Sequence, residues 1–281
     1  MPPAYTALAA PAALLRYHHD AMPRLHVVMR PETKLAVVVR TGAQGGKKVS
    51  CTMGWDRRDD SFTMGQWMGG RLYPFECDIS PDGAWFIYNA LNAKWKDTAT
   101  LGAYGALSRA PYLKAEKLFP NGSRWTHATL IFDRTRGRHQ RDTPCPPMPE
   151  RFGLTSGSYH SRLRRDGWRT RERKLALGPH HSADRYARPL VGVARLEKLF
   201  HASHLDSTTP MFFETHCIVD TGGQLHAHDD WEWAEVDGTD LVWIAAGILF
   251  RARQGPRGLP ETPRVLYDFN PMRFKRLLAP Y

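Results

Sequence analysis

The chain has 281 residues, of which 42% are hydrophobic, 11% aromatic and 24% charged, and its formal net charge is +11. These fractions exclude a disordered polyelectrolyte, because they supply enough apolar and aromatic surface to build a core. Every apolar run is shorter than the ~20 residues of a membrane-spanning helix, so no membrane partner is expected. The length suits one large domain or two small ones.

The cysteines and the first residues of the chain indicate the cellular compartment of the protein. The four cysteines are far apart in sequence, at Cys51, Cys77, Cys145 and Cys217. This spacing excludes a C-x-x-C metal or redox pair and predicts reduced thiols in a cytoplasmic protein. The early apolar run follows no basic region and contains prolines, so we expect no signal peptide.

The positive charge is distributed unevenly. Residues 134–174 carry a net charge of +8, residues 175–250 carry −7, and residues 251–281 carry +5. Such asymmetry is typical of a protein with an anionic partner, and it is equally typical of segments that neutralise each other inside one fold.

Short β-prone runs begin after an Ala- and Pro-rich extension at residues 1–23, in which 7–18 is a helix candidate. Valine-rich and alternating patterns predict strands in the first half of the chain at 25–30, 34–40, 47–58, 61–73, 85–88 and 125–134. Between them, the mixed stretch 100–120 suggests a helical turn within 111–119. Residues 136–153 contain clustered prolines and predict a loop.

The second half repeats the pattern of short strands and tight turns. Two strands, 159–165 and 168–177, are predicted around the turn Asp166-Gly167, and 187–200 is the best helix candidate. Further strands are expected at 212–220, 231–238, 240–247, 248–254 and 264–270. No long helix alternates with strands, so a parallel α/β sheet is disfavoured and an all-β fold is predicted.

Turn signals recur at a spacing that suggests repeated units. Asp82-Gly83, Asn121-Gly122, Asp166-Gly167 and Gly222-Gly223 are separated by 39, 45 and 56 residues. A four-stranded propeller blade occupies ~40–45 residues. The spacing therefore favours a β-propeller, while a β-sandwich or an irregular barrel is the alternative.

The tetrapeptide Ser80-Pro81-Asp82-Gly83, followed by the strand that starts at Trp85, resembles the blade repeat of TolB-type β-propellers. The stretch 237–253 resembles a second blade with a two-residue hairpin at Ala246-Gly247. The order of motifs from Gly54 to Gly83, then 108–113 and 265–274, is similar to a group of bacterial proteins with no assigned activity. The resemblance implies a propeller of about five blades over 24–281, with 1–23 as an extension, and it implies no chemistry.

A histidine–acid cluster is the sharpest candidate for a metal site. His216, His226, His228, Asp229 and Asp230 lie within fifteen residues. Histidine pairs with a carboxylate suit zinc or non-haem iron. The alternative, which the neighbouring Gly222-Gly223 favours, is a solvated polar turn.

An arginine-rich stretch at 159–174 is the candidate for binding a polyanion or nucleic acid. Guanidinium groups bind phosphate and aromatic rings stack on bases, and both are supplied here by Arg162, Arg164, Arg165, Arg169, Arg171 and Arg173 with Tyr159 and Trp168. The alternative is a solvated hairpin whose arginines pair with the acidic stretch 214–240.

A polar–aromatic group precedes the Ser-Pro-Asp-Gly turn. Its members are Gln66, Trp67, Arg71, Tyr73, Glu76 and Asp78. Residues of these types line the central channels of propellers, so Trp67, Arg71, Tyr73 and Asp78 are channel ligand candidates. The alternative places the aromatic rings in the core and pairs Arg71 with Glu76 or Asp78.

The sequence lacks the local motifs of serine hydrolases, P-loop NTPases, Rossmann oxidoreductases and zincins. We therefore predict a non-catalytic binding or scaffold protein with a protein partner and no cofactor. One alternative is a hydrolase that uses carboxylates or His226 and His228 in a propeller channel. Another is a polyanion-binding protein that uses 159–174.

Overall fold

The fold is all-β in the computed structural model, which describes residues 23–121, 129–133, 153–203 and 210–281. Two compact units make up the described chain. One comprises Leu25–Asp166 with Met272–Tyr281, and the other comprises Gly167–Pro271. The predicted extension, its helix candidate at 7–18 and most of the loop at 136–153 lie outside the described residues. No helix in the described part of the chain is long and apolar enough to cross a membrane.

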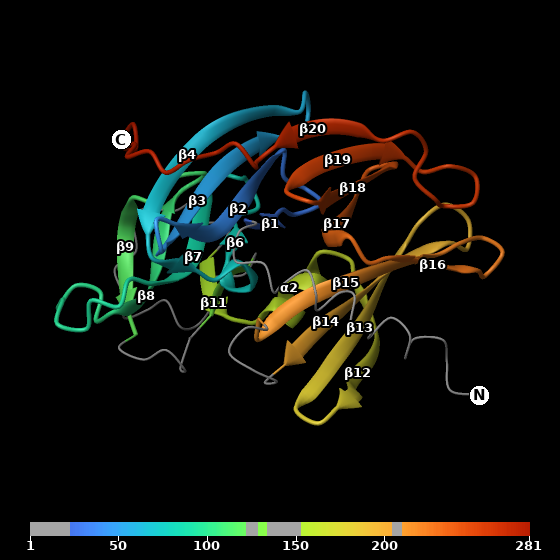
Figure 1. The fold of residues 1–281 in the computed structure, drawn as a ribbon, viewed down its shortest axis with the longest axis horizontal. Coiled ribbons are helices and arrows are strands. Elements are labelled where there is room, and N and C mark those ends of the chain that lie inside the picture. Colours follow the sequence, from blue (N-terminus) through green and yellow to red (C-terminus); the bar gives the residue numbers. More distant parts are fainter. Residues whose placement is uncertain (1–22, 122–128, 134–152, 204–209) are drawn as a thin grey trace. The chain divides into compact units, whose positions relative to one another are not determined.

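The first sheet of the Leu25–Asp166 unit is a four-stranded meander in chain order (Figure 1). Its strands are β1 Arg24–Val28, β2 Leu35–Gln44, β3 Lys47–Asp56 and β4 Ser61–Gly69. The β2–β3 ladder is unbroken from Leu35, opposite Asp56, to Gln44, opposite Lys47. Valines at 37, 38 and 39 are all buried, so β2 is covered on both faces.

The second sheet of this unit follows the same up-and-down plan. Its strands are β5 Arg71–Leu72, β6 Asp78–Ile79, β7 Trp85–Leu91, β8 Ala103–Arg109 and β9 Ala115–Pro120. Both β5 and β6 pair with β7. One apolar core joins the first and second sheets, and it includes Val28, Val37, Val39, Phe86 and Tyr88.

Two strands and one short helix complete the Leu25–Asp166 unit. β10 Leu130–Asp133 pairs with β11 Gly153–Ser156, and α2 Tyr159–Arg165 follows. Phe132 and Leu154 pack against Trp85, Ile87 and Leu107 of the second sheet.

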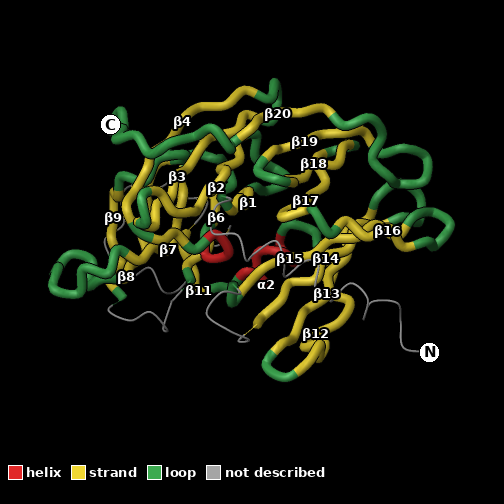
Figure 2. The backbone as a smooth tube through the Cα atoms, viewed as in Figure 1, coloured by secondary structure: helices red, strands yellow, loops and turns green. Residues whose placement is uncertain are grey.

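The Gly167–Pro271 unit contains two further meanders (Figure 2). The five-stranded sheet is formed by β12 Arg169–Gly178, β13 His181–Pro189, β14 Arg195–Ser203, β15 Phe212–Val219 and β16 Leu225–His228. The four-stranded sheet is formed by β17 Trp231–Asp237, β18 Asp240–Ala245, β19 Ile248–Arg253 and β20 Arg264–Asp268.

The sheets have the strand order of propeller blades, and the described chain contains four of them with four or more strands. The prediction of about five blades is therefore wrong. Division of the chain length by a blade length assumed that every stretch forms a blade. Between β9 and β12 the described residues instead form the β10–β11 pair and α2.

Three local predictions are wrong. Residues 159–165 form helix α2 rather than a strand, so the predicted arginine-rich hairpin 159–174 does not exist. Residues 187–200 form the end of β13 and most of β14 rather than a helix. Residues 115–120 form β9, which pairs with β8, rather than a helical turn.

The Ser-Pro-Asp-Gly turn has the predicted geometry. The Asp82 carboxylate accepts a hydrogen bond from the Ala84 amide at 3.0 Å, and the Ser80 hydroxyl accepts one from the Trp85 amide at 2.9 Å. Gly83 has a φ of +75°, which glycine adopts without strain. The predicted hairpin at Ala246-Gly247 is also confirmed, with φ angles of 50° and 77° that match a type I′ turn.

A candidate surface that binds an extended segment

The residues 272–281 form no helix or strand, yet they lie on the Leu25–Asp166 unit along a continuous set of contacts (Figure 1). We call these residues the closing segment. Apolar packing anchors its middle. Met272 and Leu277 contact an apolar cluster formed by Val49, Cys51 and Trp67. In the β3–β4 ladder Cys51 lies opposite Trp67, so both side chains share one face of the sheet.

Side chains of the sheets supply the hydrogen bonds that a neighbouring strand would otherwise supply. Gln44 Oε1 accepts from the Phe274 amide at 2.7 Å, and Gln66 Nε2 donates to the Leu277 carbonyl at 3.0 Å. Arg40 Nη2 donates to the Met272 carbonyl at 3.4 Å. Because these bonds reach backbone atoms, they recognise an extended chain and do not depend on its side chains.

Gln66 holds its position through bonds to its own unit. Its Oε1 accepts from the amides of Leu113 and Lys114, each at 2.8 Å. The two amides identify Oε1 as the oxygen of the side chain and leave Nε2 to donate to the Leu277 carbonyl. The side chain is therefore fixed in the orientation that binds the segment.

Tyr281 contacts polar and cationic groups at the end of β8 and in the β8–β9 connection. Its hydroxyl accepts from the Arg109 amide at 3.2 Å and donates to the Lys114 carbonyl at 2.8 Å. The Arg109 guanidinium carbon lies 5.4 Å, and the Lys114 Nζ 4.8 Å, from the centroid of the ring. The Tyr112 ring meets it edge-on at 5.9 Å. Lys114 Nζ also donates to the Tyr281 carbonyl.

A second aromatic contact holds the start of the closing segment. The ring of Phe274 meets Trp67 edge-on, with the centroids 5.8 Å apart. The Arg40 guanidinium carbon lies 5.4 Å from the Trp67 ring. Trp67 Nε1 is buried and has no hydrogen-bond partner in the part of the chain that the structure describes. The sheets therefore contribute Arg40, Gln44, Gln66, Trp67, Arg109, Tyr112 and Lys114, which we call the segment surface.

The predicted channel ligands do not converge. Trp67 is buried under the closing segment, Arg71 is exposed on β5, and Tyr73 is half-buried. Asp78 is fully buried. Of the wider polar–aromatic group, Gln66 and Trp67 share the segment surface, and Glu76 accepts a hydrogen bond from Asn89 Nδ2 at 2.9 Å.

Asp78 instead anchors two of the arginines from the basic stretch. Arg165 donates from Nη1 to Oδ2 at 2.6 Å and from Nη2 to Oδ1 at 2.9 Å. Arg162 Nε lies 3.8 Å from Asp78 Oδ1, and its Nη1 donates to the Cys77 carbonyl. Asp78 Oδ2 also accepts from the Phe132 amide at 2.9 Å. The nearby arginines keep the pKa of Asp78 low although burial opposes them.

The remaining arginines of that stretch face solvent. Arg164 is exposed on α2, and Arg169, Arg171 and Arg173 are exposed on β12, the edge strand of its sheet. Arg173 Nε pairs with Asp184 Oδ2 at 2.8 Å. The predicted polyanion site is thus divided between a buried ion cluster around Asp78 and a charged edge strand, a placement that protects sheet edges from association.

The histidine candidates lie in the five-stranded sheet, where His216 and His228 are directly opposite each other on β15 and β16. His216 Nδ1 donates to the Trp231 carbonyl at 3.3 Å, and His228 stacks on the Trp231 ring at 3.8 Å. His226 Nε2 bonds instead to Asp220 at 3.0 Å. Asp229 follows β16 in the turn before β17. Among the described residues, no group of three or more His, Cys, Asp or Glu side chains has an arrangement that could hold a metal ion.

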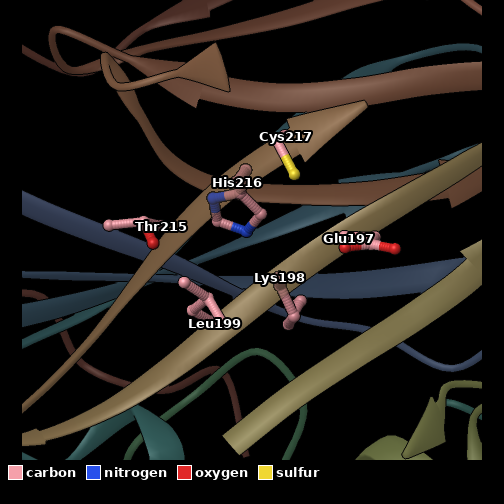
Figure 3. Close-up of a pocket in the computed structure, with 6 residues that line it drawn as sticks. All are labelled: Glu197, Lys198, Leu199, Thr215, His216 and Cys217. Atoms are coloured by element: carbon pink, nitrogen blue, oxygen red, sulfur yellow. The ribbon is translucent and has the colours of Figure 1, made fainter. Parts of the chain in front are cut away.

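The sequence did not predict the buried polar side chains that bond to one another in this sheet. Lys198 Nζ bonds Glu214 Oε1 at 3.0 Å, and His201 links His181 at 3.0 Å to the Thr215 hydroxyl at 2.9 Å. Burial, followed by the nearby His181, lowers the pKa of His201 to about 3, so this imidazole is neutral. Figure 3 shows the gap between β14 and β15 that contains Thr215, and it does not admit a water molecule. Through these bonds the buried side chains connect β13, β14 and β15.

Most residues of the segment surface were not predicted from the sequence. Gln66 and Trp67 were candidates, but Arg40, Gln44, Arg109, Lys114 and Tyr281 were not. These residues are separated by up to 241 positions, and no motif links them. The aromatic Tyr281, which follows an apolar and proline-containing run, is the one local signal that could have indicated an anchored segment.

Comparisons with known proteins add little to this geometry. No family model matches the chain, and no curated protein matches it. Among solved structures, an acylaminoacyl peptidase in complex with Z-Gly-Gly-Phe-chloromethyl ketone has 11% identity and a TM-score of 0.32, covering 90% of this chain and 54% of that one. The Pyrococcus horikoshii acylaminoacyl peptidase has 12% identity and a TM-score of 0.27, covering 88% and 53%. The chain therefore spans about half the length of these peptidases.

Proposed function

We propose that this protein is a non-catalytic, propeller-type binding protein that engages a partner protein through the segment surface. The observation that carries the proposal is the set of side chains that bind the backbone of 272–281. Gln44, Gln66 and Arg40 bond three backbone groups of a segment that has no strand pairing of its own. A surface that satisfies extended backbone in this way accepts a peptide from another chain on the same terms.

The closing segment then acts as an occupant in cis. A tethered segment competes with a free peptide at an effective concentration in the millimolar range. A partner must therefore bind more tightly than the closing segment, or meet the protein when that segment has left the surface. This competition makes binding selective without any catalytic group.

The proposal is tested with a fluorescein-labelled peptide of the sequence 272–281 and the full chain carrying F274A and Y281A. These changes weaken the occupant in cis and leave the sheets intact. We expect saturable binding by fluorescence anisotropy. Adding Gln44→Ala and Gln66→Ala should weaken that binding roughly 30-fold, because each lost hydrogen bond contributes about 1 kcal/mol.

A matched control replaces a glutamine of the other unit. Gln224→Ala should leave the affinity for the peptide unchanged, because Gln224 bonds Arg257 and the Asp220 carboxylate and is not part of the segment surface. Absence of saturable binding to the folded F274A/Y281A chain, with an unchanged circular dichroism spectrum, would refute the proposed function.

A further inference from the structure

We propose that the partner segment is acidic and places a tyrosine side chain on the contacts that Tyr281 makes with Arg109 and Lys114. This inference rests on the proposed function and names the chemistry of its ligand. Two independent observations carry it: the charge of the segment surface and the hydrogen bonds around the tyrosine hydroxyl.

The segment surface and its own occupant carry charge of the same sign. Arg40, Arg109 and Lys114 all contact the closing segment, and Arg109 also pairs with Glu116 at 3.0 Å. The closing segment contributes three more cations at Arg273, Lys275 and Arg276. Lys275 and Arg276 are exposed, and neither forms an ion pair within the described residues.

The repulsion between these like charges is clearest at Arg40. Its pKa is lowered mainly by burial, and the positive charge of Arg273 lowers it further. Like charges at short range oppose binding, whereas opposite charges attract over about 10 Å at 0.1 M salt. A segment with carboxylates in place of Arg273, Lys275 and Arg276 would therefore bind this surface more tightly than the closing segment.

The contacts at the β8–β9 connection favour tyrosine over phenylalanine. The Tyr281 hydroxyl both accepts from the Arg109 amide and donates to the Lys114 carbonyl. Phenylalanine would remove both bonds while it kept the ring contacts. The cations at 5.4 Å and 4.8 Å favour the face of an aromatic ring, so an aliphatic side chain would lose that attraction as well.

Because a partner segment and the closing segment differ in charge, we expect the partner segment to replace the closing segment on the segment surface. At rest, the closing segment packs on Trp67, and Tyr281 contacts Arg109 and Lys114. An acidic, tyrosine-bearing segment of a partner forms the same backbone bonds and adds favourable charge, so it displaces the closing segment. A basic segment lacks this advantage and competes poorly with the tethered copy.

The test measures binding of three labelled peptides to the wild-type full chain by fluorescence anisotropy. The first has the sequence 272–281, the second carries R273E, K275E and R276E, and the third adds Y281F to the second. At about 20 mM salt we expect the acidic peptide to bind at least tenfold more tightly than the first. The advantage should shrink at 0.5 M salt, since salt screens exposed charge.

The Y281F peptide should bind roughly 30-fold more weakly than the acidic peptide with tyrosine, because two hydrogen bonds of about 1 kcal/mol each are lost. In the protein, Lys114→Ala should weaken binding of the acidic peptide, while Lys94→Ala, an exposed lysine in the β7–β8 connection, should not.

Equal affinity of the basic and acidic peptides, or equal affinity of the tyrosine and phenylalanine peptides, would overturn this inference. A scrambled acidic peptide that binds as well as the ordered one would also overturn it, because charge alone would then suffice. If the 272–281 peptide still binds the F274A/Y281A chain, the proposed function stands in each of these cases. If no peptide binds either chain, both proposals fall.

Discussion

Asp78 shows how a single buried carboxylate organises its surroundings. Its two oxygens receive bonds from Arg165 and from the Phe132 amide, and Arg162 lies close by. It thereby connects β6, β10 and α2. Charged side chains this deep are tolerated only when they are paired.

Removal of this charge should be costly. Asp78→Asn leaves Arg162 buried without its counter-charge and leaves Arg165 with Asp166 as its carboxylate partner. We expect a loss of about 3–5 kcal/mol in the free energy of unfolding. Chemical denaturation measures it. Asp97→Asn, at a half-buried position in the β7–β8 connection, is the control and should cost under about 1 kcal/mol. A loss at Asp78 no larger than the loss at Asp97 would contradict the structural role of the ion cluster.

His201 should make stability depend on pH. Its pKa is about 3 in the folded protein, mainly because of burial, whereas the ordinary pKa of histidine is about 6.5. A group with a lowered folded pKa contributes stability above its unfolded pKa, and that contribution is lost as the pH falls. Between about pH 6.5 and pH 3, this residue should therefore add a slope of about 1.4 kcal/mol per pH unit.

The pH prediction is checked by urea unfolding at several values between pH 7 and pH 4. His201→Gln should flatten the dependence, since glutamine cannot gain a proton. The exposed His180, replaced in the same way, should leave the slope unchanged. An equal slope in the wild type and the His201→Gln variant would rule out this residue as the source.

At the scale of elements, turns were predictable and α2 was not. The Ser-Pro-Asp-Gly turn depends on four adjacent residues, so its geometry follows from local sequence. In α2, Tyr159, Ser161 and Leu163 alternate as in a strand. However, the buried residues are Tyr159, Arg162 and Leu163, which share one face at helical spacing. The buried Arg162 disguised that face, because its ion partner Asp78 is far away in sequence.

The predicted helix at 187–200 failed for a related reason. The run is apolar enough to be buried in either conformation, and pattern alone does not distinguish a short buried helix from a buried strand. In the structure β14 is paired on both sides, by β13 and β15, and nearly every residue is buried. Tertiary pairing decided the conformation of this segment. The segment surface was hidden in the same way, since its parts meet only after folding.

The Ser-Pro-Asp-Gly turn should be sensitive to its glycine. Gly83→Ala forces a residue with a side chain to adopt a φ of +75° and brings its Cβ to 3.4 Å from Leu35 Cβ. We expect a cost of about 1–2 kcal/mol in thermal or chemical unfolding. Gly69→Ala is a control, because it has open space around its Cβ position and no positive φ. Equal effects at the two positions would contradict the role of the turn.

Across the whole molecule, the charged side chains are distributed differently from what the net charge of +11 suggests. Several arginines pair within the fold, among them Arg165 with Asp78, Arg188 with Glu235 and Arg251 with Asp237. Part of the basic character of 134–174 and the acidic character of 175–250 is therefore internal. The closing segment keeps its cations exposed on a surface that is itself basic.

The path of the chain also gives the closing segment a particular position. The chain leaves the Leu25–Asp166 unit after Asp166, builds the Gly167–Pro271 unit, and returns at Met272. The contacts of 272–281 with the segment surface thus hold the last part of the described chain to the Leu25–Asp166 unit. If a partner segment replaced these contacts, residues 272–281 would be released from the Leu25–Asp166 unit.

Hydrogen–deuterium exchange of the wild-type chain, with and without a saturating amount of the acidic tyrosine peptide, tests the central claim directly. The Phe274 amide, which is bonded to Gln44, should exchange faster when the peptide displaces the closing segment. The Leu113 and Lys114 amides, which are bonded to Gln66 within their own unit, should remain protected. Unchanged exchange at Phe274 with the peptide bound would show that the partner segment and the closing segment do not share one surface.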